Sequence, residues 1–364
     1  MMDLSALSGE DQRKLFAFHV FSKLEGAVTA GMIHLGDALG LYRVMSQMSG
    51  WTTSDELAAT AGLHERWVRE WLHNQAAARI VEWREDAIGV SFRLSEPAID
   101  VLANDESEHF GMGMFHRLPQ TMGALHDMPR AFQTGVGSNY DSHGPEGAVG
   151  IERSFGPWSR VNLLTKVIPA IGGLRSQLED GIRVVDIGCG AGGVSLILAE
   201  AFPHSTFVGY DISRFALERA NERLARSGLT NVSFHHPDDH PLPTRGTVDF
   251  VTTFDCIHDM TSPQKMMDHI SEMLVEHGRW LLVDIKAHDT FEENATRNPM
   301  ASLMYGISVL SCMSSALSEP QGAGLGTLGL PERLARSMAL EAGFTTFTRL
   351  DVEHSVNAFY EVHK

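Results

Sequence analysis

From about residue 180 onward, short β-branched runs alternate with segments that have the length and spacing of helices. The strand-like runs are IRVVDIG, TFVGYDI, VSFHH, DFVTTFD and RWLLVDI, and helical segments such as RFALERANERLARSG and PQKMMDHISEMLVEH lie between them. Strands that alternate with helices of about 10 to 15 residues are typical of βαβ units with a parallel sheet. The second half of the chain is therefore expected to be an α/β domain.

The N-terminal part has a different pattern, with apolar residues at helical spacing from residue 10 to residue 48. Residues 52 to 58 (TTSDELA) are typical of a cap followed by a helix with acidic residues in its first turn. A turn at Gly62 leads into LHERWVREWLHNQAAARIVEW, and EDAIGVSFRLS is typical of a two-stranded wing. These segments together predict a winged-helix unit over roughly residues 35 to 95.

Winged helices often bind DNA, but the charges of this one disfavour that role. Residues 1 to 105 carry nine basic and 15 acidic side chains, and the formal net charge of the chain is −17. The expected recognition helix carries Arg66 and Arg69, which Glu65 and Glu70 offset. Because binding to phosphates needs clustered Lys and Arg, we expect no nucleic-acid partner and assign this unit to dimerisation and to a substrate-lid role.

The first strand of the α/β part runs into a glycine-rich turn, Asp186-Ile-Gly-Cys-Gly-Ala-Gly-Gly193. Glycines at such a turn permit positive φ angles and let a ligand approach the backbone. The next strand ends in an acid, Asp211, and an acidic loop that contains Asp238 and Asp239 follows the third strand. Carboxylates in these positions are suited to accept hydrogen bonds from sugar hydroxyls and from an exocyclic amine.

The glycine-rich turn, Asp211 and the acidic loop occur in this order along the chain. Together they resemble the class I S-adenosylmethionine-dependent methyltransferases over residues 180 to 286. The resemblance implies a Rossmann-like, seven-stranded doubly wound α/β sheet. The whole layout is also similar to bacterial two-domain methyltransferases with an N-terminal winged helix. The resemblance also implies S-adenosylmethionine as the cofactor and the following domains: 1–105 for dimerisation, 106–175 as a helical connector and substrate lid, and 176–364 for the cofactor. The cofactor-binding residues that it implies are Asp186, Gly188, Gly190, Gly192, Asp211, Ile212, Asp238, Asp239, Phe254 and Asp255.

The segment HHPDDH, residues 235 to 240, also suggests a metal site, because His and Asp are plausible ligands for zinc or iron. Adjacent residues on a strand point to opposite faces, however, and the segment coincides with the loop expected to contact adenine. We therefore expect no metal here.

Residues 254 to 260, Phe-Asp-Cys-Ile-His-Asp-Met, lie at the end of the fourth strand, where open α/β sheets hold their ligands. This stretch resembles the plant-type small-molecule O-methyltransferases, which implies that His258 is a general base and that Asp259 lies beside it. Met260 stands where that family has a Trp. Methyl transfer needs no covalent intermediate, so Cys256 is interpreted as lining of the site, and the alternative for His258 is a structural role at a helix start.

Residues 286 to 327 form a long insertion that is expected to close over the substrate. It contains a helical stretch whose side chains fit either a substrate pocket or a hydrophobic core. Candidate substrate contacts in the insertion and in the connector are His116, Tyr140, Glu293, Tyr305, Ser308 and Cys312, with His126 and His143 as weaker ones. Glu293 or Asp259 is expected to orient His258 or the substrate.

The sequence as a whole predicts a homodimeric methyltransferase that acts on a small molecule, with oxygen as the preferred acceptor and sulfur or nitrogen left open. A thiol has a reference pKa of about 8.5 and needs less help from a base than most hydroxyl groups. Two alternatives are a winged-helix transcriptional regulator that binds the cofactor as a sensor, and a nicotinamide-dependent dehydrogenase.

The remaining features concern the compartment. No apolar run approaches the 18 residues that a membrane span needs, and the N-terminal residues lack the pattern of a secretory signal. Three Cys in 364 residues do not form a disulfide framework. We expect a reduced, cytoplasmic protein without a membrane partner.

Overall fold

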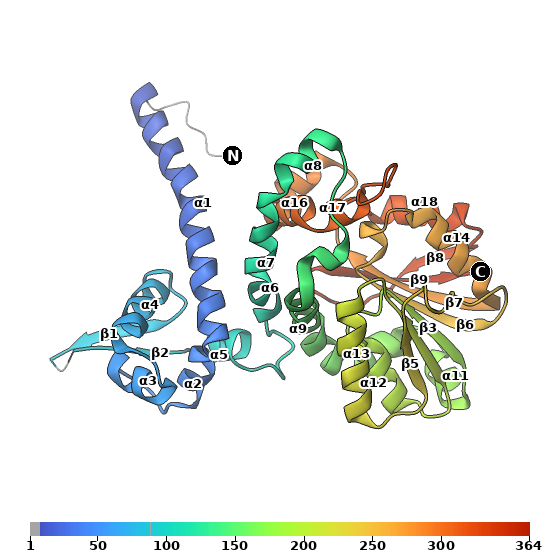
Figure 1. The fold of residues 1–364 in the computed structure, drawn as a ribbon, viewed down its shortest axis with the longest axis horizontal. Helices are drawn as coiled ribbons and strands as arrows, with labels where there is room; N and C mark the ends of the chain where they lie inside the picture. The colour runs from blue at the N-terminus through green and yellow to red at the C-terminus, as the bar shows by residue number, and fades with distance from the viewer. Residues whose placement is uncertain (1–7, 88) are drawn as a thin grey trace. The chain divides into compact units, whose positions relative to one another are not determined.

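The computed structural model describes residues 8–87 and 89–364. Contacts divide the chain into two compact units, Met1–Leu118 with one hydrophobic core and Pro119–Lys364 with two (Figure 1). Residues 106–118 of the predicted connector are grouped with the first unit, and residues 119–175 are grouped with the second. Among the described residues, no helix has both the length and the apolar composition that crossing a bilayer requires.

The first unit contains the predicted winged helix. Thr53 and Glu56 form a complete capping box at the start of a helix that ends at Gly62, which has a φ of 68°. The wing is an antiparallel pair in which Trp83 lies opposite Phe92. The elements are α1 Gly9–Ala38, α2 Leu41–Gln47, α3 Ser54–Ala61, α4 Glu65–Ala77, β1 Glu82–Asp86, β2 Gly89–Arg93, α5 Glu96–Leu102 and α6 Met112–His116.

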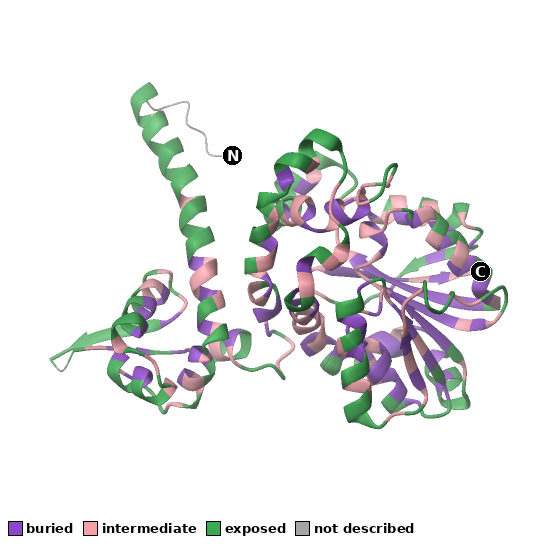
Figure 2. Ribbon diagram, viewed as in Figure 1, coloured by how far each residue is buried: buried purple, intermediate pink, exposed green. Residues whose placement is uncertain are grey.

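Only the C-terminal part of the long helix α1 takes part in the core of this unit. Its buried residues are Thr29, Ile33 and Gly36, whereas no residue between 9 and 28 is buried (Figure 2). Several large apolar side chains in that stretch are exposed: Leu15, Phe16, Phe18, Val20, Phe21, Leu24 and Val28.

The second unit begins with short helices and then forms a seven-stranded sheet. Its N-terminal elements are α7 Leu118–Gly123, η1 Ala124–His126, α8 Met128–Thr134, η2 Tyr140–His143, α9 Gly144–Asn162, η3 Leu163–Val167, α10 Ile168–Ala170 and α11 Leu174–Asp180. The strands are β3 Arg183–Ile187, β4 Thr206–Tyr210, β5 Val232–His235, β6 Val248–Phe254, β7 Leu274–Ile285, β8 Thr346–Arg349 and β9 Asn357–His363. The later helices are α12 Gly193–Ala201, α13 Arg214–Ser227, η4 Ile257–Asp259, α14 Pro263–Met273, α15 Phe291–Arg297, α16 Ala301–Leu310, α17 Cys312–Ala316 and α18 Glu332–Glu341.

The strand order is β5-β4-β3-β6-β7-β9-β8, and β9 runs antiparallel to both of its neighbours. Alternate residues of β7 enter the two cores on opposite faces of the sheet: Leu281 and Val283 pack with α11, α12 and α13, while Trp280 and Leu282 pack with α14 and α18. This two-residue period is what a central strand covered on both faces requires. The predicted seven-stranded, doubly wound α/β fold is confirmed.

The order of the strands reverses between β3 and β6. The turns that follow these two strands meet there, since a Cβ atom built on Gly188 would lie only 2.6 Å from the Cβ of Cys256. Open α/β sheets bind their ligands at such a reversal, outside the carboxyl ends of the strands. The fold therefore brings the glycine turn and the stretch around His258 to one edge of the sheet.

Candidate cofactor and acceptor site

The glycine turn after β3 is built from residues in the left-handed region, with φ angles of 69° at Gly188 and 72° at Gly192. A Cβ on Gly192 would lie 2.4 Å from the ring of Phe234, so this position is closed by packing. Gly190 differs, because its φ is 54° but no atom lies within 4 Å of its would-be Cβ. The backbone at Gly190 is therefore the part of the turn that another molecule is able to approach.

Asp211, directly after β4, holds this turn in place through hydrogen bonds. Its carboxylate accepts hydrogen bonds from the backbone N–H groups of Gly190 and Ser213, each at 2.7 Å. Burial raises the pKa of Asp211, and these two N–H groups partly offset that effect. Because each carboxylate oxygen has two lone pairs, the group retains acceptor capacity for a ligand hydroxyl. Ile212, the next residue, is 61% exposed.

Asp186, the acid of β3, is buried beneath the turn. It accepts hydrogen bonds from the hydroxyl groups of Ser195 on α12 and Thr252 on β6, both at 2.7 Å. Burial raises its pKa to about 6 in spite of these two hydrogen bonds. Its carboxylate thus joins the turn, α12 and β6.

The acidic loop after β5 lies at the surface. Asp238 and Asp239 are exposed, and the Asp239 carboxylate pairs with the Arg214 guanidinium at 2.9 Å, which lowers the pKa of Asp239. In the segment considered as a metal site, the rings of His235 and His240 pack edge to face, with centroids 4.2 Å apart. A surface cavity of about 310 Å³ lies here, lined by residues of α13 and of this loop, among them Leu217, Asn221, Phe234 and His236.

The end of β6 presents Phe254 and Asp255. Phe254 packs edge to face on Phe155 of α9, with ring centroids 5.9 Å apart. Asp255 has a φ of 49°, rare for a residue other than glycine, and its carboxylate accepts a hydrogen bond from the side-chain amide of Asn357. Burial, reinforced by the charge of Asp284, raises the pKa of Asp255 to about 8.

His258 lies in η4, and only 2% of its surface is exposed. Its Nδ1 lies 2.6 Å from Oδ1 of Asp284, a buried residue of β7, and Cys312, the first residue of α17, is close enough to the ring to contribute to its raised pKa. We refer to His258, Asp284 and Cys312 as the His258 cluster. The second carboxylate oxygen of Asp284 is buried and has no hydrogen-bond partner among the described residues.

The surroundings of the His258 imidazole favour its charged form. Burial alone would lower its pKa, but the charge of Asp284 and the hydrogen bonds with Asp284 and Cys312 raise it well above its ordinary value. An imidazole beside a buried carboxylate is suited to accept a proton and to stabilise it afterwards.

The predicted insertion covers the His258 cluster. Gly326 N donates to His258 O at 3.2 Å, Ala323 N donates to Thr261 O at 2.9 Å, and Thr327 N donates to the Ser308 hydroxyl at 3.1 Å. Gly326 has a φ of 76°, and its would-be Cβ lies 2.3 Å from the Ser308 oxygen, so this loop lies tightly against α16. Of the predicted substrate contacts, the structure brings Cys312 to His258, and the Gly326 loop joins Ser308 to the same region.

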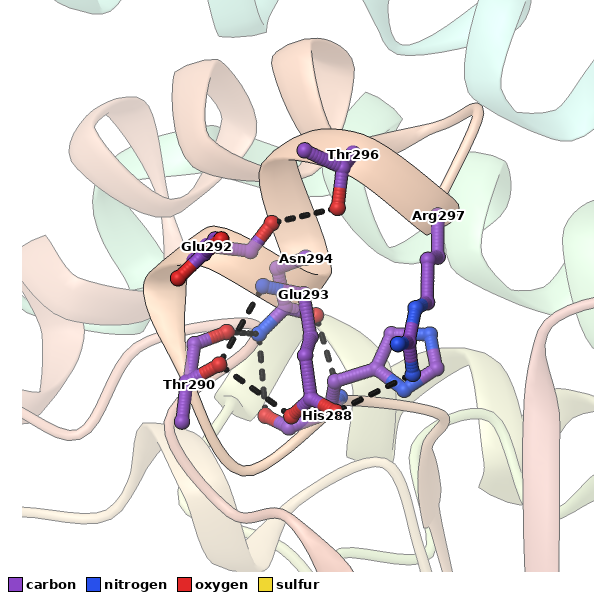
Figure 3. A network of polar contacts seen from close by, with 7 residues as sticks. All are labelled: His288, Thr290, Glu292, Glu293, Asn294, Thr296 and Arg297. Atoms are coloured by element: carbon purple, nitrogen blue, oxygen red, sulfur yellow. Dashed lines mark hydrogen bonds and ion pairs between the residues drawn. The ribbon is translucent and has the colours of Figure 1, made fainter.

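The other predicted substrate residues have different surroundings. Glu293 belongs to the polar network at the start of α15, where its carboxylate pairs with Arg297 and accepts a hydrogen bond from Thr290 (Figure 3). Tyr305 of α16 is 37% exposed and packs near Phe291. The remaining two are Tyr140, whose ring lies 6.0 Å from that of His143, and His116 of the first unit, whose Nδ1 lies 3.9 Å from Asp37.

The carboxylate that contacts His258 is therefore Asp284, a residue that the sequence analysis did not single out. The sequence contains a feature that could have identified Asp284, because this acid lies inside the apolar run RWLLVDI. A buried acid is costly unless a partner stabilises it, so an acid in a central strand is a candidate for a functional site.

Comparisons with known proteins agree with this architecture. Residues 178–322 match the family described as "Methyltransferase domain", and residues 27–99 match the "Rv2258c-like winged HTH domain". The chain therefore combines a methyltransferase domain with an N-terminal winged-helix domain, as the sequence analysis predicted.

Similar sequences include two plant enzymes. The chain is 32% identical to (S)-tetrahydroprotoberberine N-methyltransferase of Eschscholzia californica over 120 residues, which are 33% of this chain and 34% of that protein. It is 30% identical to (S)-coclaurine N-methyltransferase of Papaver somniferum over 116 residues, 32% of this chain and 33% of the relative. The similarity thus spans about a third of the length of these relatives.

Solved structures are similar over nearly the whole chain. A structure described as a putative O-methyltransferase from Nostoc punctiforme has a TM-score of 0.72 at 16% identity and covers 95% of this chain and 98% of that one. Human N-acetylserotonin methyltransferase in complex with SAM has a TM-score of 0.69 at 14% identity, with 99% of both chains covered. At these identities the likeness establishes the fold.

Proposed function

We propose that this protein is an S-adenosylmethionine-dependent methyltransferase that methylates a small molecule, with oxygen as the acceptor atom. The observation that carries this proposal is the position of the His258 cluster beside the glycine turn of a methyltransferase domain. Several similar folds are described as O-methyltransferases, among them the mitomycin 7-O-methyltransferase MmcR, which has a TM-score of 0.67.

The residues after the parallel strands fit the cofactor. The open backbone at Gly190 suits the methionine part, and the remaining lone pairs of Asp211 suit the ribose hydroxyls. Asp238 and Asp239 are proposed to accept from the adenine amine, while Ile212 and Phe254 supply apolar surface for the ring. Asp186 is proposed to act indirectly by holding the turn. The bound cofactor would supply a methyl group on a positively charged sulfur.

In the proposed mechanism, this chain aligns the acceptor and accepts its proton. Asp284 fixes Nδ1 of His258, so the other ring nitrogen is the one available to an acceptor hydroxyl. The raised pKa makes the neutral imidazole a stronger base, and Asp284 stabilises the imidazolium that forms. General-base help of this kind typically accelerates a reaction about 10²- to 10⁴-fold. Asp259 is proposed to contribute negative charge beside this site.

Since His258 is buried under the insertion, the acceptor has to displace part of that cover. Tyr140, Glu293, Tyr305 and Ser308 remain proposed contacts for a substrate held below it. A screen of phenols, thiols and heteroaromatic amines with a labelled methyl donor tests the acceptor class. Labelled phenol ethers would support oxygen, whereas product from amines alone would overturn that part of the proposal.

The enzyme proposal and the sensor alternative predict different results. A sensor would bind S-adenosylhomocysteine and operator-like DNA and would transfer no methyl group. Helix α4 carries Arg66 and Arg69 in ion pairs with Glu70 and Glu65, so its basic groups are already neutralised within the helix. This pairing favours the enzyme, and a gel shift at low salt that detects tight DNA binding would contradict it.

The proposal includes a homodimer that forms through the first unit. The exposed apolar side chains of α1, with Phe18 74% and Phe21 67% exposed, form a surface that a second copy of the same helix is suited to cover. The proposal also places the protein in the cytoplasm, where thiols such as Cys189, Cys256 and Cys312 stay reduced. Cell fractionation tests that location.

A further inference from the structure

Asp141 is an acid of the second unit to which the proposed mechanism gives no role. It lies in η2, and its Oδ2 accepts a hydrogen bond from the backbone N–H of Arg214 at 3.2 Å. Its other carboxylate oxygen, Oδ1, is buried and has no hydrogen-bond partner in the part of the chain that the structure describes. A buried polar atom without a partner costs free energy, and a bound group usually completes it.

The start of α13 holds Asp141 next to Asp211. Ser213 N donates to the Asp211 carboxylate at 2.7 Å, and the next backbone N–H, that of Arg214, donates to Asp141. Two carboxylates are therefore attached to consecutive N–H groups. Burial is the main cause of the raised pKa of Asp211, and the charge of Asp141 adds to it. Hydrogen-bond donors from a ligand would stabilise two anionic groups in this arrangement.

The Asp211 carboxylate is already partly occupied. One of its oxygens accepts from Gly190 N and the other from Ser213 N, so each keeps one lone pair for a ligand. Oδ1 of Asp141, by contrast, has both of its lone pairs unused. A ribose carries two neighbouring hydroxyl groups, and each of them needs an acceptor when the sugar leaves water. The two acids together are suited to receive these two hydroxyl groups separately.

The segment that carries Asp141, residues 136–143, is also attached to the insertion. Ser138 N donates to the hydroxyl of Ser314 on α17 at 2.9 Å. Gly135 and Gly144 flank the segment with φ angles of 73° and 65°, so the backbone is able to turn at both ends. A shift of this segment would open the buried oxygen of Asp141 to an entering ligand.

We propose that Asp141 is a second ribose acid of the cofactor site, which accepts a hydrogen bond from one ribose hydroxyl of S-adenosylmethionine while Asp211 accepts from the other. This inference rests on the proposed function, because it concerns the same cofactor. The contact would come from the helical connector, whereas the other proposed cofactor contacts come from the strands of the sheet and the turns that follow them.

The test is calorimetric titration of the full chain with S-adenosylhomocysteine and with its 2′-deoxy and 3′-deoxy analogues. Asp141→Asn keeps a carbonyl oxygen for Arg214 N but replaces the unpaired oxygen with an NH2 group, which donates and does not accept. The variant should bind S-adenosylhomocysteine about tenfold more weakly than the wild type. For the analogue that lacks the contacted hydroxyl, the difference between the two proteins should disappear. Ser142→Ala, an exposed change in the same segment, is the matched control and should leave the affinity unchanged.

Two results would overturn the inference and leave the proposed function standing. The first is equal affinity of Asp141→Asn and the wild type for S-adenosylhomocysteine. The second is an equal loss for S-adenosylhomocysteine and both deoxy analogues, which would show that residue 141 supports the shape of the site without contacting the ribose. A wild-type protein that does not bind S-adenosylhomocysteine at all would instead refute the proposed cofactor site, and the inference with it.

A measurement on the wild-type protein keeps the inference testable if Asp141→Asn fails to fold. Hydrogen–deuterium exchange of the peptide that contains residues 136–143 is recorded with and without saturating S-adenosylhomocysteine. Slower exchange in the presence of the ligand supports a contact with this segment. Exchange that the ligand leaves unchanged, in protein that binds it by calorimetry, overturns the inference.

Discussion

At the scale of single residues, Asp211 has two roles that depend on one carboxylate. It holds the glycine turn through the N–H of Gly190 and holds the start of α13 through the N–H of Ser213. Its remaining lone pairs are the ones that we assign to the ribose. A substitution at this position therefore changes both the shape of the turn and the direct contact with the ligand.

Asp211→Ala is expected to weaken binding of S-adenosylhomocysteine by at least about tenfold, because a charged hydrogen-bond partner is worth roughly 1.5–3 kcal/mol. Isothermal titration calorimetry measures the change. Asp238→Ala, at an exposed position of the same proposed site, is the matched comparison and should cost less. An unchanged affinity in Asp211→Ala would contradict the assigned role.

His258 illustrates how neighbours change the chemistry of a residue. Its pKa is raised, so the folded protein holds a proton on the ring that the unfolded chain loses near pH 6.5. The charged pair with Asp284 consequently contributes its full stability below that pH. The contribution is lost as the pH rises through the higher pKa of the folded state.

The proposed turnover should therefore increase as the pH rises above neutrality, because only the neutral imidazole accepts a proton. Asp284→Asn should lower the pKa of His258 and move this increase to lower pH, which a pH profile of kcat measures. Asp255 and Cys312 also influence the electrostatics of this ring. Asp255→Asn is the control for titration of Asp255 in the same range, and identical profiles for Asp284→Asn and the parent would refute the assignment.

At the scale of elements, the glycine turn shows two different reasons for the same residue type. Gly192 needs to be glycine because the ring of Phe234 fills the space of a side chain, whereas Gly190 faces open space. Both have positive φ, so both would be strained by any other residue. At position 192 a side chain would disturb the packing, whereas at position 190 it would obstruct access to the backbone.

Gly192→Ala is expected to lower the free energy of unfolding by roughly 2–5 kcal/mol, since left-handed strain adds to a clash with Phe234. Gly190→Ala should lower it by only roughly 1–2 kcal/mol but should weaken cofactor binding more than its stability loss suggests. Urea denaturation and calorimetry separate the two effects. Equal stability losses in the two variants would show that the contact with Phe234 does not limit position 192.

At the scale of the whole molecule, α1 gives the first unit more apolar surface than its own core uses. Residues 9 to 28 contain exposed phenylalanines and leucines and no buried residue. Exposed apolar surface of this extent is typical of an interface between proteins. The anionic charge of the chain and the paired arginines of α4 make a second copy a better candidate partner than nucleic acid.

Phe18→Glu combined with Phe21→Glu is expected to convert a dimer into a monomer, because two charges would be desolvated in the proposed interface. Light scattering coupled to size-exclusion chromatography measures the mass. Lys23→Glu, another exposed substitution on the same helix, is the matched control and should remain dimeric. A wild-type protein that is monomeric at all accessible concentrations would remove this part of the proposal.

The class of fold can be read from the sequence, and so can the order of the segments that we assign to the proposed site. Alternating strands and helices predict a parallel sheet because each segment carries its own periodicity, and the glycine turn and His258 follow strands whose ends meet at one edge. Only the packing of separate elements brings Asp284 of β7 to within 2.6 Å of Nδ1 of His258. Such contacts depend on how separate elements pack in space, and neither periodicity nor turn chemistry encodes the distance between two side chains far apart in the chain.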